Sequence, residues 1–289
     1  MIGGFMQCQR ISGLTEWIEF LNLVDIPVLK HTVRGLLALR KDDENLSAWA
    51  IAHVIKHDPL MTIKVLRYLQ QNKNTSQNHE VIEVEQALMM IGLENSLKKI
   101  PADPVVEDVL SKESMDALVY LLRVVHRSNL ASTYASNWAV RLQDLHFEEI
   151  RIAALLHDFT ELLMWCFAPA GMLKIRSMQQ QDNTLRSNIA QEQIFGFSLN
   201  QLQSELVKLW SLPTLLITLM DDQYAAQARV RNVSLAVNLA RHSSNGWNDA
   251  ALPDDYKDIG KLLHMETKDV IAMIGRANNK MESRKKIYV

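Results

Sequence analysis

Two histidines and an aspartate in the first quarter of the chain have types and spacing that could do chemistry. His53 and His57 lie four residues apart, on one face of any helix, and Asp58 follows directly. Histidines at this spacing can share a zinc ion. The alternative is structural, because Asp58 before Pro59 is typical of a helix start, where the carboxylate accepts from free N–H groups and proline needs no donor. No third ligand is near in sequence, so the helix start is favoured.

Covalent catalysis has little support in the residue types. Cys166 lies between Trp165 and Phe167, with no basic neighbour to lower its pKa, so we expect a buried, unreactive thiol. The other cysteine is Cys8, and two cysteines do not form a disulfide framework, which indicates a reducing compartment. The sequence also has no glycine-rich phosphate loop and no serine hydrolase elbow.

Composition excludes several further classes. The formal charge of −2 argues against a large nucleic-acid footprint, which requires a basic face. No apolar run approaches the roughly 18–20 residues of a membrane span. The first ten residues lack a basic region followed by an apolar one, so no secretory signal is expected. We therefore expect a soluble, cytoplasmic protein that binds neither nucleic acid nor membrane.

The elements that must position any site are helices. Only 10 glycines and 7 prolines occur, and segments with the period-two pattern of strands are missing, which predicts an all-α fold. Gly92 is expected to end one helix as its C-cap. A helical hairpin should close the chain. The other helices are expected at residues 30–40, 46–56, 59–70, 84–91, 112–139, 147–167, 170–179, 184–195, 199–209, 213–224 and 229–242.

The clearest break in these patterns is the segment PADP, from Pro101 to Pro104. It predicts a division between an N-terminal helical part, residues 1–103, and a helical core with the C-terminal hairpin, residues 104–289. The two parts are expected to form one unit overall, with the N-terminal part packed on the core.

Several ordered segments resemble one protein family. The N-terminal ones are Ile26-Pro27-Val28-Leu29, the HDPLMTIKVLRY stretch within residues 52–68, and VEQALMMIGL at residues 84–93. Further along, AALLHDFTELL at residues 153–163 and KLWSLP at residues 208–213 follow in the same order, and residues 252–274 resemble a C-terminal hairpin. Together they resemble the HDOD family, which is related to the HD phosphohydrolases. The resemblance implies an HD-like helical fold in bacterial signalling proteins.

The resemblance also implies a candidate metal site. HD hydrolases hold a divalent metal with imidazole and carboxylate ligands, and the metal acidifies water and polarises phosphate. Their first histidine corresponds to His126, and their His-Asp pair, on one helix, corresponds to His157 and Asp158. The cofactor implied is iron, manganese, magnesium or zinc.

Other positions depart from the hydrolase pattern. The last aspartate of the ligand set corresponds to Asn238, which is neutral, and the usual lysine after the pair is replaced by Glu161, which would repel a phosphate in a ligand site. Relatives with a larger metal site have a further histidine where this chain has Leu199. Asp221 and Asp222 fall where those relatives have a histidine pair, and they could supply a shifted acidic site.

Two functions follow from these alternatives. A His-Asp pair joined to a second histidine can be a hydrogen-bonded network that fixes helices without metal, and we favour this interpretation. The chain would then be a regulatory module with a degenerate site that binds a signalling partner or a small ligand. The alternative is a metal-dependent phosphohydrolase acting on a nucleotide or phosphoester, which rests on His126, His157 and Asp158.

Overall fold

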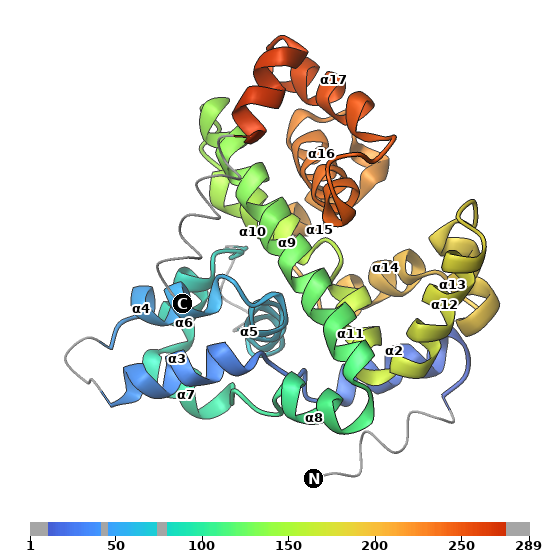
Figure 1. Ribbon diagram of the computed structural model, residues 1–289. Coiled ribbons are helices and arrows are strands. Elements are labelled where there is room, and N and C mark those ends of the chain that lie inside the picture. Colours follow the sequence, from blue (N-terminus) through green and yellow to red (C-terminus); the bar gives the residue numbers. More distant parts are fainter. Residues whose placement is uncertain (1–10, 42–45, 74–79, 276–289) are drawn as a thin grey trace. The chain divides into compact units, whose positions relative to one another are not determined.

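Helices form most of the part of the chain that the structure describes. A computed structural model describes residues 11–41, 46–73 and 80–275, so Cys8 and the basic C-terminal residues lie outside the described ranges (Figure 1). Within those ranges no strand occurs, and Val28 and Val105 form an isolated parallel bridge. The all-α prediction is therefore confirmed.

The helices fall into two compact units. The first unit comprises Met1–Asn129 with Leu155–Ile217, and the second comprises Leu130–Ala154 with Thr218–Val289. The division expected at residues 103 and 104 stays a prediction. In chain order the helices are α2 (Gly13–Leu23), α3 (Lys30–Arg40), α4 (Ala48–Ile55), α5 (Pro59–Gln71), α6 (Val84–Ile91), α7 (Leu93–Lys99), α8 (Val106–Glu113), α9 (Met115–Arg141), α10 (Phe147–Leu156), α11 (Phe159–Phe167), α12 (Pro169–Gln181), α13 (Ser187–Phe195), α14 (Leu199–Leu209), α15 (Thr214–Leu219), η3 (Asp222–Tyr224), α16 (Ala228–His242), η4 (Ser243–Asn245) and α17 (Leu252–Leu263).

In the first unit, Asp58 connects two helices of an N-terminal bundle formed by α3 to α7. Its Oδ1 accepts from the Met61 N–H at 2.9 Å, which caps α5, and Pro59 is the first residue of that helix. Its Oδ2 accepts from the Leu29 N–H at the start of α3 at 2.9 Å and from the Thr32 hydroxyl at 2.8 Å. Burial raises the pKa of this carboxyl above its ordinary value. The predicted helix start is confirmed, and its capping residue also fixes the neighbouring helix.

Two buried cations on α5 bind backbone carbonyls. Lys64 Nζ donates to the carbonyl oxygens of Ile26 at 3.1 Å and Asp103 at 2.8 Å. Arg67 donates to the carbonyls of Leu21 and Val24. Because burial disfavours the charged amine, the pKa of Lys64 is lowered to about 8. The loop before α3 and the segment before α8 are thus attached to α5 by side chains.

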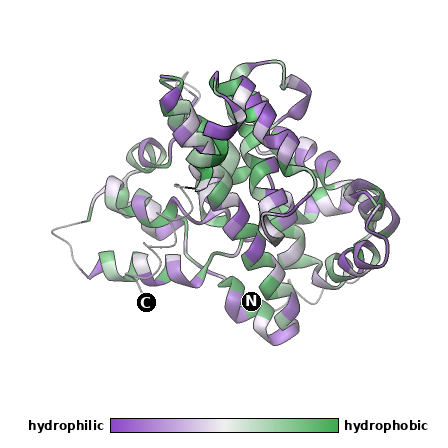
Figure 2. Ribbon diagram, turned by 45° about the horizontal axis from the view of Figure 1, so that its top comes forward, coloured by the Kyte–Doolittle hydropathy of each residue, from purple (hydrophilic) through white to green (hydrophobic). Residues whose placement is uncertain are grey.

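Helix α11 lies in the interior of the first unit, where it packs against α5, α12 and α14. Every residue of α11 is buried except Glu161. Figure 2 shows hydrophobic residues gathered on the faces that helices turn toward their neighbours. Within the described ranges no single helix has the length and apolar composition of a membrane span, and one bent pair, residues 147–167 with 169–181, meets those criteria together.

In the second unit, α16 packs against α17. Asn232, which is buried, donates from Nδ2 to the Ala135 carbonyl at 3.1 Å, and Arg229 Nε donates to Asp144 Oδ2 at 2.7 Å. His242 Nδ1 lies 2.6 Å from Asp255 Oδ2. A further helical segment follows α17 from residue 267 to 275, which agrees with the expected hairpin.

Three expected helices are wrong in their continuity. The helix expected at residues 147–167 is broken at His157 and Asp158 into α10 and α11, so this pair lies between helices and not on one helix. The one expected at residues 112–139 is interrupted at Ser114 between α8 and α9, and the one at 213–224 stops at Leu219 before the short turn η3. At each break lies a residue type that favours helix caps or turns: Asp158, Ser114 or Asp221. The spacing of apolar residues, from which the helices were expected, does not reveal such a break.

Replacing the shared capping residue should destabilise the bundle. The Asp58→Ala variant leaves the N–H groups of Leu29 and Met61 without their acceptor, so the free energy of unfolding should fall by on the order of 3 kcal/mol. Urea unfolding followed by circular dichroism measures this change. Asp116→Ala, at an exposed position in the first turn of α9, should change it by less than about 0.5 kcal/mol. Equal effects of the two substitutions would contradict the capping role of Asp58.

The buried amine should make stability depend on pH. The folded chain loses the Lys64 proton near pH 8, whereas the unfolded chain keeps it until about 10.5, so the unfolded state binds more protons in this window. The stability of the parent relative to Lys64→Met should therefore rise between pH of about 7 and about 9.5, by on the order of 2 kcal/mol. Paired urea titrations at the two pH values test this, with exposed Lys174→Met as the control. A flat or falling difference would contradict it.

Candidate functional site

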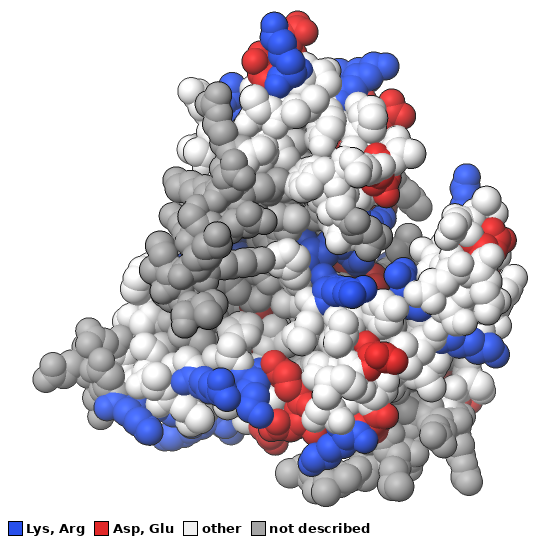
Figure 3. All heavy atoms as spheres, viewed as in Figure 1, with Lys and Arg blue, Asp and Glu red and all other residues white. Residues whose placement is uncertain are grey.

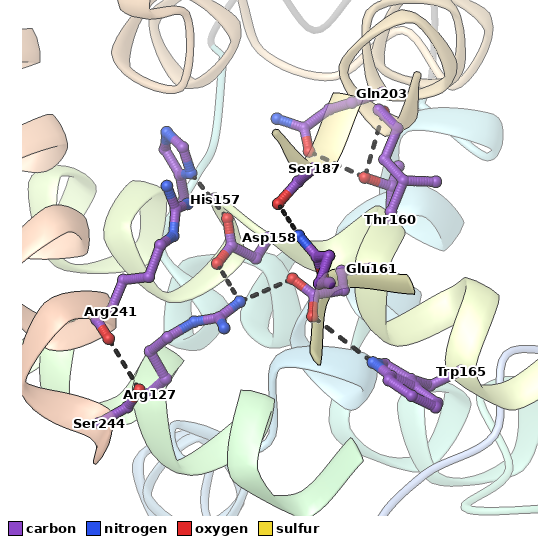
Figure 4. Close-up of polar contacts among 12 residues, drawn as sticks. Arg127, His157, Asp158, Thr160, Glu161, Trp165, Ser187, Gln203, Arg241 and Ser244 are labelled. Atoms are coloured by element: carbon purple, nitrogen blue, oxygen red, sulfur yellow. Dashed lines mark hydrogen bonds and ion pairs between the residues drawn. The ribbon is translucent and has the colours of Figure 1, made fainter. Parts of the chain in front are cut away.

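The break between α10 and α11 places His157 and Asp158 at a cluster of polar side chains in the first unit (Figure 4). His157 Nδ1 lies 3.0 Å from Asp158 Oδ1. Each of the two side chains is 13% exposed, so their polar atoms are largely shielded from solvent. The chain turns here because Asp158 has non-helical backbone angles, φ −105° and ψ 27°, while its carbonyl accepts from the first turn of α11. The sequence neighbours His157 and Asp158 are thus directly in contact.

An arginine from α9 occupies the other side of the aspartate. Arg127 Nη2 donates to Asp158 Oδ2 at 2.6 Å and to Glu161 Oε2 at 2.7 Å. Figure 4 shows the guanidinium reaching between the two carboxylates. Burial disfavours the charged guanidinium, but the charges of Glu161 and Asp158 outweigh burial and raise the pKa of Arg127 above its ordinary value. Two carboxylates therefore share one fixed cation.

An aromatic pair extends the cluster from Glu161. The Trp165 indole N–H donates to Glu161 Oε1 at 3.5 Å, and the Trp165 ring stacks on Tyr120 with centroids 5.3 Å apart. The guanidinium carbons of Arg123 and Arg176 lie 5.4 and 5.2 Å from the centroid of the Tyr120 ring. Trp165 and Cys166 are both buried, which confirms the expected burial of the cysteine, and burial raises the pKa of the Cys166 thiol.

The first implied ligand, His126, is an exposed side chain of α9 next to Arg127. Among the described residues, no three histidine, cysteine, aspartate or glutamate side chains are grouped so that they could hold a metal ion. A divalent metal at Asp158 would have to displace a guanidinium that is already hydrogen-bonded to both carboxylates. The donor set in this arrangement therefore does not fit a metal, and the ligand role of His126, His157 and Asp158 stays a prediction.

The remaining implied positions have other partners or lie in the other unit. Leu199 is a buried first residue of α14, and its carbonyl accepts from the Thr160 hydroxyl at 3.4 Å. In the second unit, Asp221 caps η3 by accepting from the Gln223 N–H, and Asp222 accepts from the Ser234 hydroxyl. Asn238 is half-buried on α16 in that unit. An acidic site built on Asp221 and Asp222 stays a prediction.

The two histidines considered for a zinc site, His53 and His57, have other partners in the structure. His53 Nδ1 lies 3.0 Å from Lys56 Nζ, and His57 Nδ1 lies 2.9 Å from Asn129 Oδ1. The Asn129 amide also donates to the His57 carbonyl at 2.8 Å. His57 thus connects the turn before α5 to α9, and the Asp58 carboxylate is directed at the backbone N–H groups of Leu29 and Met61.

Comparison with known proteins identifies the family. The model of the HDOD domain matches residues 26–226. The chain belongs to the HDOD family. No curated protein matches it. The fold is similar to those of several solved structures. The MmoQ response regulator of Methylococcus capsulatus has a TM-score of 0.61 at 17% identity, and the match covers 84% of this chain and 99% of that protein. A virulence factor of Campylobacter jejuni has a TM-score of 0.64 at 18% identity, and the match covers 86% of this chain and 89% of that protein. At these identities the likeness shows the fold alone.

Arg127 is the residue of this HDOD chain that sequence reasoning missed. The segment VVHRSNL drew attention to His126 as a ligand, although the arginine directly after it makes the ion pairs. A search of the sequence for metal ligands considers histidines and carboxylates and leaves out the cations. The signal available was Glu161, an acidic residue in the mostly apolar stretch Phe159–Phe167, where a charge requires a counter-charge within reach.

Removing Arg127 should leave two carboxylates of the HDOD domain without the cation that they share. In Arg127→Met the free energy of unfolding should fall by about 2 kcal/mol, a reduced value for a broken buried pair because Glu161 is 29% exposed. Arg123→Met, four residues earlier on α9, removes the contact with the Tyr120 ring and should lower it by less than about 1 kcal/mol. Urea titrations of both variants measure the difference. A loss in Arg127→Met no larger than in Arg123→Met would contradict the pairing.

Proposed function

We propose that this chain is a non-hydrolytic HDOD module of bacterial signal transduction, which acts in the cytoplasm by binding a protein partner or small ligand. The observation that carries the proposal is the pairing of Arg127 with both Asp158 and Glu161. A hydrolytic metal site must leave its carboxylate available to the metal, keep a coordination position open and attract an anion. Here a protein cation holds the carboxylate, so the proposed role of the His-Asp pair is structural.

Charge at two further positions supports the same proposal. Asn238 is neutral where the hydrolases have a metal-binding aspartate, and Glu161 replaces a lysine that would attract phosphate. The first replacement weakens binding of a metal, and the second weakens binding of phosphate. Glu161 also has a positive role in this chain, because it shares the Arg127 guanidinium with Asp158. A signalling role further agrees with the solved relative that is named a response regulator.

The alternative, a metal-dependent phosphohydrolase, is favoured by the 3.0 Å contact between His157 and Asp158. That contact would also orient the pair in an active site. A turnover experiment distinguishes the two functions.

We expect no metal-dependent hydrolysis of phosphodiesters. The assay is turnover of a chromogenic phosphodiester and of cyclic dinucleotides, with manganese, iron or magnesium added to protein purified without chelator. The control is the double variant His157→Ala, Asp158→Ala, which removes the two adjacent candidate ligands. Turnover by the parent that disappears in the double variant would contradict the proposal. Turnover that is equal in both proteins comes from a contaminant and leaves the parent without activity of its own.

A further inference from the structure

Three exposed apolar residues form a stripe along the N-terminal half of α9, in the first unit. Met115, Val119 and Leu122 are 59%, 42% and 39% exposed. Their spacing of four and then three residues places them on one face of the helix, and it is typical of the seam along which two helices pack. Figure 3 shows largely uncharged surface over this part of α9, with acidic side chains beside it over α8. Packing against another helix would remove the stripe from water.

Two carboxylates lie at the N-terminal end of the stripe. Glu113, the last residue of α8, and Asp116, in the first turn of α9, are both exposed. Neither carboxylate has an ion pair or a hydrogen bond in the part of the chain that the structure describes. The cation one residue before Glu113 acts elsewhere, because the pKa of Asp108 is lowered by Lys30 and also by Lys112. Glu113 and Asp116 are thus available for cations from outside the chain.

Two arginines gather at Tyr120, one residue after Val119. Arg123 is exposed on α9 and Arg176 is half-buried on α12, and their guanidinium carbons lie 5.4 and 5.2 Å from the centroid of the Tyr120 ring. The ring is stacked on buried Trp165, which fixes its position. Within the described ranges no carboxylate is paired with either arginine. Cations without a counter-charge thus follow the middle of the stripe, whereas the carboxylates precede it.

The charge pattern of this face is complementary to itself. Asp116 and Arg123 are seven residues apart on one face of α9 and equally far from the point between Val119 and Tyr120. When two copies of the helix pack antiparallel about a two-fold axis at that point, Asp116 of each copy lies opposite Arg123 of the other. Closed dimers use such contacts, in which one patch meets the same patch on the second subunit. A partner that is only acidic or only basic would match half of the face.

We propose that the N-terminal half of α9 is the contact of a homodimer. The Met115, Val119 and Leu122 side chains of two copies pack together antiparallel, flanked by two Asp116–Arg123 ion pairs. The proposal goes beyond the regulatory function and does not depend on the state of the His-Asp pair. Exposed ion pairs contribute little each, and the stripe spans about two helical turns, so we expect a weak dimer with a Kd on the order of 10–100 µM.

Sedimentation equilibrium of the full chain, from about 5 to about 500 µM, tests the contact. A concentration-dependent dimer is expected. Val119→Asp, at the centre of the stripe, should weaken it at least about tenfold because a charge is then buried in an apolar contact. Ile189→Asp, at an equally exposed position on α13, is the matched control and should leave the Kd within about twofold. A parent that stays monomeric over this range, or that dimerises no better than Val119→Asp, would overturn the proposal.

Charge reversal tests the antiparallel pairing. Asp116→Arg alone and Arg123→Asp alone each place like charges opposite one another, so each variant should dimerise at least about tenfold more weakly than the parent. An equimolar mixture of the two variants restores opposite charges in both pairs and should form a heterodimer of near-parental affinity. Both positions are exposed, so the fold should be kept, which circular dichroism checks. A mixture that associates no better than the separate variants would overturn the antiparallel contact.

Discussion

The guanidinium of Arg127 lies between two carboxylates, at 2.6 Å from Asp158 and 2.7 Å from Glu161. This arrangement follows from a simple constraint: α11 lies in the interior of the first unit, and a charge near that interior requires a partner. The Arg127 guanidinium compensates the charges of Asp158, at the break before α11, and of Glu161, the one residue of α11 that is not buried. Of the two residues that the resemblance matches to a metal-binding pair, His157 and Asp158, the aspartate is here paired with a protein cation.

The same constraint shapes the N-terminal bundle by other means. Among the described residues no cation is in hydrogen-bond contact with Asp58. Backbone N–H groups and a hydroxyl satisfy its carboxylate, whose pKa burial raises. Lys64 and Arg67 bind carbonyl oxygens of loops. These three residues connect α5 to α3 and to the segments before α3 and α8. Polar groups that the fold buries thus specify how the helices join.

The sequence predicted well the features that depend on local pattern. The bounds of α3, α6 and α14, the start of α5 after Asp58 and the Gly92 cap agree with expectation, because periodicity and caps act over a few residues. The break at Asp158 was missed because apolar residues continue on both sides of it at helical spacing. Arg127 was missed because its partners, Asp158 and Glu161, lie more than thirty positions away in sequence.

A double-mutant cycle between Arg127 and Asp158 tests the central claim most directly. The parent, Arg127→Met, Asp158→Asn and the double variant are unfolded in urea, with a chelator and again with excess manganese. We predict a coupling energy of at least about 1 kcal/mol that is the same in both conditions, because the partner of Asp158 is an arginine. A coupling below about 0.3 kcal/mol, together with manganese stabilisation of the parent that Asp158→Asn abolishes, would show that the carboxylate serves a metal and would contradict the account.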